Sequence, residues 1–84
     1  MFELAFHNRE DGDERDRVMR LSRSVDWAYV PRRGDFVKLS PDLGGAEVKL
    51  VSFDRQGEAC VQLGRTALSD EQLRELLESG WSIA

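Results

Sequence analysis

A complete helix, with its own start and stop signals, lies near the end of this 84-residue chain. Ser69 is followed three residues later by Gln72, which is the spacing of a capping box, and Gly80 stands where helices often end in a left-handed residue. Between these signals one narrow apolar stripe is formed by Leu73, Leu76 and Leu77. A helix of roughly ten residues is unstable alone in water, so the stripe must pack on the rest of the chain. The sequence therefore predicts a docked helix over about 69–79.

Both ends of this helix carry further signals. Leu68 and Leu73 occupy the two positions of a hydrophobic staple, which fixes the entry of the chain into the helix. Trp81 follows Gly80, and we expect its side chain to fold back on Leu76 as in a Schellman ending.

The other apolar residues alternate with polar ones, which is typical of half-buried strands. This alternation predicts strands at 2–7, 17–21, 25–30, 36–39, 46–53 and 59–63. In the fifth of these the apolar parity changes at Leu50 and Val51, which indicates either a β-bulge or a stretch covered on both faces. Pro31 ends the third strand because proline has no amide donor for a ladder.

Turn residues separate the predicted strands. The acidic segment from Asn8 to Asp16 has no aliphatic side chain and is expected to form a solvated hairpin loop. Reversals are also expected at Gly34 and Asp35, over Ser40 to Gly45, and over Asp54 to Gly57.

These elements predict a mainly β (α+β) fold in a single domain, 1–84. Five or six antiparallel strands would curl into a small SH3-like roll or barrel, and the C-terminal helix would close it. A chain of this length buries only about two thirds of its unfolded surface, so the core is expected to be modest.

A short motif supports a barrel. The run from Val30 to Leu39 contains Pro31, Arg32, Gly34, Asp35 and Val37. It resembles small bacterial and phage proteins of unknown function that carry a proline-arginine-x-glycine-aspartate-x-valine pattern ahead of a curled β-sheet. The resemblance implies a small barrel and implies no activity, cofactor or catalytic residue.

The residues that support catalysis or metal binding are few. The single His7 and the single Cys60 exclude a zinc site with four Cys or His ligands, and neither has a catalytic neighbour in sequence. The acidic residues between Glu10 and Asp16 lack the glutamate that an EF-hand needs at its twelfth position, so we expect no bound calcium. We therefore expect no enzyme activity, no metal and no cofactor.

The chain has no predicted membrane contact. No apolar stretch approaches the roughly 20 residues of a membrane helix. The strand at 2–7 has no basic flank of the kind that a signal peptide has. One unpaired cysteine suits a reducing compartment, so the expected location is the cytoplasm.

The sharpest functional signal is an arginine-rich segment with two aromatic residues. The candidate partner-binding residues are Arg20, Arg23, Trp27, Tyr29, Arg32 and Arg33. Trp27 and Tyr29 share parity with Val25, so at least one of them is expected in the core. We expect a non-enzymatic module that binds another protein, or a second copy of itself through an unpaired edge strand. Nucleic-acid binding by the arginines and aromatic rings is the alternative, disfavoured by the net charge of −4.

Overall fold

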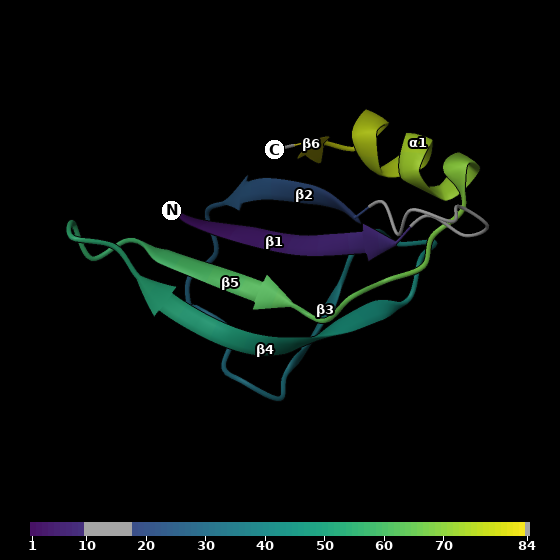
Figure 1. Ribbon diagram of the computed structural model, residues 1–84. Helices are drawn as coiled ribbons and strands as arrows, with labels where there is room; N and C mark the ends of the chain where they lie inside the picture. The colour runs from purple at the N-terminus through teal and green to yellow at the C-terminus, as the bar shows by residue number, and fades with distance from the viewer. Residues whose placement is uncertain (10–17, 84) are drawn as a thin grey trace.

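The computed structural model of the chain describes residues 1–9 and 18–83. It is mainly β, with one six-stranded mixed sheet and one short helix (Figure 1). In chain order the elements are β1 (Phe2–Arg9), β2 (Val18–Val25), β3 (Phe36–Lys38), β4 (Gly45–Phe53), β5 (Ala59–Leu63), α1 (Asp70–Glu78) and β6 (Ser82–Ile83). Across the sheet the strand order is β3-β4-β5-β1-β2-β6.

Two local antiparallel units make up this sheet, and a parallel pair joins them. β1 pairs with β2, and β3, β4 and β5 form a meander, as the alternation predicts. β5 then lies parallel to β1, with Leu4 opposite Val61, so the expectation of an all-antiparallel sheet is wrong. Period-two alternation is the same in parallel and antiparallel strands, and for that reason the sequence does not reveal this long-range pairing.

The sheet is curved, and the core is formed by side chains of β1 to β5 together with Leu73 and Leu76 of α1 and with Trp81. Phe6, Leu21 and Val48 have no exposed surface. In the described part of the chain β3 and β6 are the two ends of the sheet and do not pair with each other, so the predicted closed barrel is not formed. The SH3-like arrangement stays a prediction.

Trp81 bridges the two ends of the sheet. It precedes β6, and its indole Nε1 donates a hydrogen bond of 3.0 Å to the carbonyl of Leu39, just after β3. The ring is 3% exposed and meets Phe6 edge to face at a centroid distance of 5.0 Å. The Trp81 side chain therefore links the ends of the sheet near β3 and β6, which no backbone hydrogen bonds between described residues join directly.

The structure confirms the predicted helix and both of its ends. The Ser69 hydroxyl accepts from the Gln72 amide, and the Gln72 side chain accepts from the Ser69 amide. Gly80 has φ of +113°, and the Trp81 amide donates to the Leu76 carbonyl, as in a Schellman ending. Of the apolar stripe, Leu73 and Leu76 are buried, whereas Leu77 is 40% exposed and lies at the edge of the contact.

Two predicted strands have different limits. β1 extends to Arg9, and Asn8, which we assigned to a solvated loop, is fully buried. The rest of that loop, including the acidic residues weighed for calcium, lies outside the described residues. β2 continues to Val25, and residues 26–35 contain no strand, so the strand predicted at 25–30 is wrong.

The irregularity predicted in β4 is a β-bulge. The pairing of β4 with β5 shifts between Val48 and Leu50, so the alternation resumes one residue late. In the following hairpin Asp54 Oδ1 accepts from the amides of Gln56 and Glu58, and Gly57 has φ of +82°. The predicted turn at 54–57 is confirmed.

Candidate functional site

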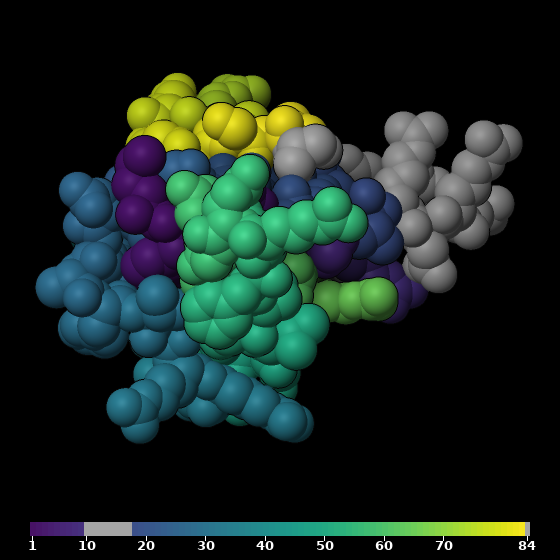
Figure 2. Space-filling model, turned by 90° about the vertical axis from the view of Figure 1, so that its left-hand side faces the viewer, coloured from purple at the N-terminus to yellow at the C-terminus, as the bar shows by residue number. Residues whose placement is uncertain are grey.

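Residues 26–35 connect β2 to β3, and Val30 and Pro31 within this segment are partly or fully buried. Figure 2 shows this segment in blue and teal on the left and lower part of the surface, with α1 at the top. Pro31 cannot donate to a ladder, and the segment turns back at Gly34, where φ is +96°. The amide of Asp35 donates to the Arg32 carbonyl, and Asp35 Oδ2 accepts from the Arg32 amide. The predicted turn at Gly34 and Asp35 is confirmed, and it holds Arg32 and Arg33 at the surface.

Both aromatic residues of the segment are accessible to solvent. Trp27 is 45% exposed and Tyr29 is 75% exposed, so the expectation that at least one packs in the core is wrong. Trp27 still contacts Phe2 edge to face, at a centroid distance of 5.6 Å. This contact anchors one side of its ring, whereas the Tyr29 ring projects into water.

The structure separates the six predicted partner-binding residues into three groups. Arg20 lies on the outer face of β2, where its Nη2 is 2.8 Å from Glu3 Oε1. Arg23 is exposed next to Gly80, at the end of α1. The remaining four, Trp27, Tyr29, Arg32 and Arg33, lie together on the 26–35 segment. The arginines therefore do not form one continuous basic face.

A groove of about 510 Å³ lies between the 26–35 segment and β3. We call it the aromatic groove, and its lining residues are Trp27, Tyr29, Pro31, Asp35, Phe36, Val37 and Lys38. Phe36 is 75% exposed, like Tyr29. Three accessible aromatic rings around one groove form an apolar surface of the kind that marks a binding site.

The groove follows a strand edge that lacks a neighbour. β3 is an end strand of the sheet within the described residues. The Val48 amide donates to the Asp35 carbonyl, whereas the Glu47 carbonyl accepts from Gly64 on the other side of β4. Backbone groups alternate in direction along a strand, so the N–H and C=O groups of Phe36 and Lys38 point away from β4. The free edge of β3 thus offers donors and acceptors to an added strand.

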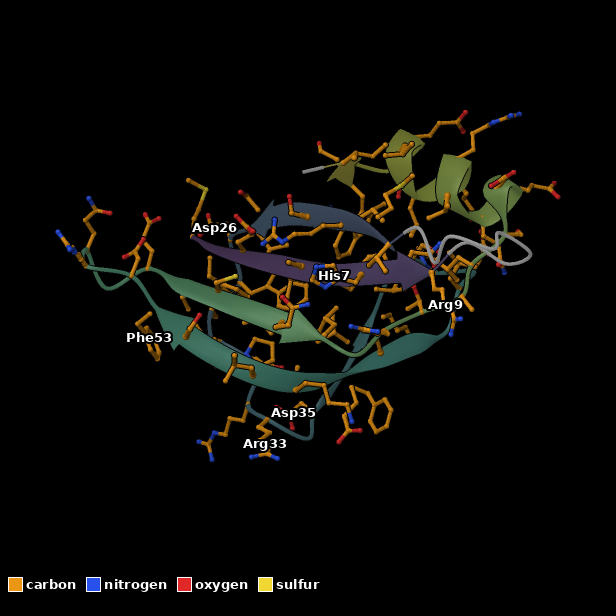
Figure 3. All side chains as sticks on the ribbon, in the orientation of Figure 1. His7, Arg9, Asp26, Arg33, Asp35 and Phe53 are labelled. Atoms are coloured by element: carbon orange, nitrogen blue, oxygen red, sulfur yellow. The ribbon has the colours of Figure 1, made fainter. Side chains whose placement is uncertain are left out.

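A second groove, of about 400 Å³, lies on the other side of Pro31. We call it the basic groove, lined by Pro31, Arg32, Arg33, Lys49, Leu50 and Phe53. Figure 3 shows Arg33 at the tip of the loop below β4 and Phe53 at the end of β4. Leu50 is 60% exposed and Phe53 is 66% exposed, so apolar surface and positive charge meet here.

Sequence reasoning missed Phe36, Lys49, Leu50 and Phe53 as members of the site. The parity change in β4 was a usable signal, because a bulge moves apolar residues out of the alternation that buries them. Phe36 directly follows the turn at Asp35, where an exposed edge strand begins. Their proximity to Arg32 depends on the fold of β3 onto β4 and was not visible in the sequence.

His7 and Cys60 do not form a catalytic pair. His7 lies on the outer face of the sheet (Figure 3), with Nδ1 3.2 Å from the Gln62 amide nitrogen. Cys60 is opposite Glu3, four residues from His7 along β1, which is about 13 Å at strand spacing. Cys60 borders a third cavity of about 280 Å³ near the N-terminus, and His7 is not among its lining residues.

Metal-binding clusters and membrane-spanning helices are both absent from the part of the chain that the structure describes. Within residues 1–9 and 18–83, no group of three or more His, Cys, Asp or Glu side chains is arranged to hold a metal ion. The only helix described, α1, is too short and too polar to cross a bilayer.

Carboxylates gather on the exposed side of α1. Desolvation raises the pKa of the Glu75 carboxyl. A hydrogen bond with Asp42 raises this pKa further, as does electrostatic repulsion from Asp42, Glu71 and Glu78. The carboxylates of α1 and Asp42 do not line either of the two grooves.

Comparison of the chain with protein-family models, with curated proteins and with solved structures gives no match. The resemblance to small bacterial and phage proteins through the Pro31–Val37 motif therefore stays a prediction.

Proposed function

We propose that this protein is a non-enzymatic binding module that holds an extended peptide segment of a partner protein in the aromatic groove. The observation that carries the proposal is the combination of exposed aromatic rings with the free edge of β3. An added strand obtains affinity from main-chain hydrogen bonds and specificity from pockets for alternate side chains. The groove supplies both kinds of contact.

The aromatic groove suits peptide side chains in particular. Trp27, Tyr29 and Phe36 offer large, rigid surfaces that lose little conformational entropy on binding. Tyr and Trp are also the residues that most often dominate binding energy at interfaces. Trp27 is held by Phe2, so part of the groove is already in place before a partner arrives.

Single-stranded nucleic acid is the second candidate for this surface. Tyr29 stands exposed near Arg32 and Arg33, and stacking next to a cation is how sequence-tolerant sites bind single strands. We rank nucleic-acid binding below peptide binding because Arg20 is paired with Glu3 on another face and the chain carries a net charge of −4.

Self-association through an edge strand is the third candidate. β3 has three residues and β6 has two, and short end strands are one of the ways in which natural sheets limit edge-to-edge pairing. Sedimentation velocity across a range of protein concentrations tests it, since a dimer formed through β3 would dissociate on dilution.

An array of decapeptides with randomised sequences, acetylated and amidated at their ends, tests the proposed function. We expect a subset of peptides to bind, and we expect Tyr29→Ala and Phe36→Ala each to weaken the tightest of them about 30-fold in calorimetric titration, corresponding to ~2 kcal/mol for an interfacial hot spot. Leu77→Ala is the matched control, because it removes an exposed apolar side chain from α1.

Two results would overturn the proposed function. One is an array without any peptide bound above background. The other is an equal loss of peptide affinity in Tyr29→Ala and in the Leu77→Ala control. Binding at the aromatic groove requires Tyr29→Ala to weaken the affinity much more than Leu77→Ala does.

A further inference from the structure

The basic groove holds positive charge that the protein itself leaves unpaired. Arg32 and Arg33 are both exposed, and neither side chain has a carboxylate partner among the described residues. Lys49, on the opposite wall, pairs with Glu47 at 2.9 Å. The turn closed by Asp35 fixes the backbone of both arginines, so their side chains start from a defined position.

We infer that the partner segment is acidic, and that Arg32 and Arg33 bind carboxylates next to the part of the peptide held in the aromatic groove. This inference rests on the proposed function and adds a chemical class to it. Pro31 lines both grooves, so a chain that leaves the free edge of β3 meets the arginines directly.

Charge complementarity supports this assignment. The guanidinium group offers a planar fork of donors that fits a carboxylate in two hydrogen bonds. Lys38 adds a third cation on the aromatic groove, and the carboxylate there, Asp35, already accepts a hydrogen bond from the Arg32 amide. The chain as a whole is acidic, and its carboxylates on α1 lie on another element, so a local positive surface selects acidic segments and repels basic ones.

Apolar surface in the same groove points to a peptide in preference to a nucleic acid. Leu50 and Phe53 are more than half exposed and form the wall that faces the arginines. A nucleic-acid strand needs a basic track over several nucleotides, whereas the unpaired cations among the described groove residues are Arg32, Arg33 and Lys38, and Asp35 interrupts them. An acidic segment with apolar residues interspersed satisfies both the charge and the apolar wall.

A charge swap tests the inference. On the decapeptide array, the wild-type protein is expected to favour sequences rich in Asp and Glu. The double variant Arg32→Glu/Arg33→Glu is expected to bind the best acidic peptide about tenfold more weakly at 50 mM salt and to prefer peptides rich in Lys and Arg. Arg65→Glu/Arg74→Glu, which reverses two exposed arginines outside both grooves, is the charge-matched control and is expected to leave the preference unchanged.

Each outcome separates the inference from the proposed function. Two results would overturn the inference and leave the proposed function standing. In the first, the bound peptides require Tyr29 and Phe36 but are not enriched in Asp and Glu. In the second, the preference for acidic peptides persists in the Arg32→Glu/Arg33→Glu variant. An empty array would overturn both the inference and the proposed function. Fluorescence anisotropy with a twelve-nucleotide single strand completes the test, because binding tighter than that of the best peptide and lost in the double variant would assign the arginines to nucleic acid. Unchanged thermal melting of the double variant confirms that its fold is intact.

Discussion

Asn8 ties the end of β1 to the link between β5 and α1, and its replacement gives a sharp test of the fold. The side chain has no exposed surface. Its Oδ1 accepts two hydrogen bonds of 2.7 Å, from the amide of Leu68 and from the hydroxyl of Thr66. Its Nδ2 donates a long bond of 3.4 Å to the Leu68 carbonyl. Removal of the side chain leaves the Leu68 amide without its acceptor.

The cost of Asn8→Ala follows from these contacts. A buried donor left unsatisfied costs ~1–3 kcal/mol, and the Thr66 hydroxyl adds less because it can rotate toward another acceptor. We expect the free energy of unfolding to fall by about 2–3 kcal/mol, a large part of the 5–15 kcal/mol that is usual for a domain.

Urea denaturation followed by far-ultraviolet circular dichroism measures this change. Thr66→Val is the companion variant and should cost about 1 kcal/mol alone, but almost nothing in the Asn8→Ala background, since the two side chains share one bond. A loss below about 0.5 kcal/mol for Asn8→Ala would refute the reasoning, because it would place the side chain in water.

Three further outcomes are expected. Trp81→Phe keeps an aromatic ring but loses the bond to Leu39, so we expect urea denaturation to show a loss of ~1–2 kcal/mol, and an unchanged stability would contradict the bridge between the ends of the sheet. Leu76→Ala should cost ~2–5 kcal/mol while Leu77→Ala stays within about 0.5 kcal/mol, and equal effects would mean that the helix docks on another face. Glu75→Gln should stabilise the protein at neutral pH, because the folded state raises the pKa of this carboxyl and so disfavours its charged form. That gain should shrink as the pH falls through the raised pKa, and a gain that is constant with pH would argue against the charge as its cause.

The parts of the fold that the sequence predicted are those with local causes. Ser69, Gln72 and Gly80 act within a few residues, so the helix and both of its ends were predictable. The hairpin turn at Asp54 and the bulge near Leu50 are local as well. Asn8 was recognisable in part, because it continues the inward parity of Phe2, Leu4 and Phe6, but its polar side chain favoured a loop.

The parts that failed depend on contacts between distant segments. Trp27 and Tyr29 alternate like strand residues, yet they form no strand. The positions beside β1 and β2, where the next strand of a hairpin would pair, are taken by β5 and β6. The candidate site was accordingly half predicted. Its aromatic and arginine members lie on one segment, whereas Phe36 and Phe53 join them only through the folding of β3 and β4.

Amide hydrogen exchange at β3 tests the proposed binding most directly. With the tightest array peptide at saturation, the amides of Phe36 and Lys38 are expected to exchange more slowly, since an added strand accepts hydrogen bonds from them. The amide of Val37, which faces β4, should change little. Slower exchange at β6, or no change at Phe36 and Lys38 while the peptide is bound, would contradict strand addition at the free edge of β3.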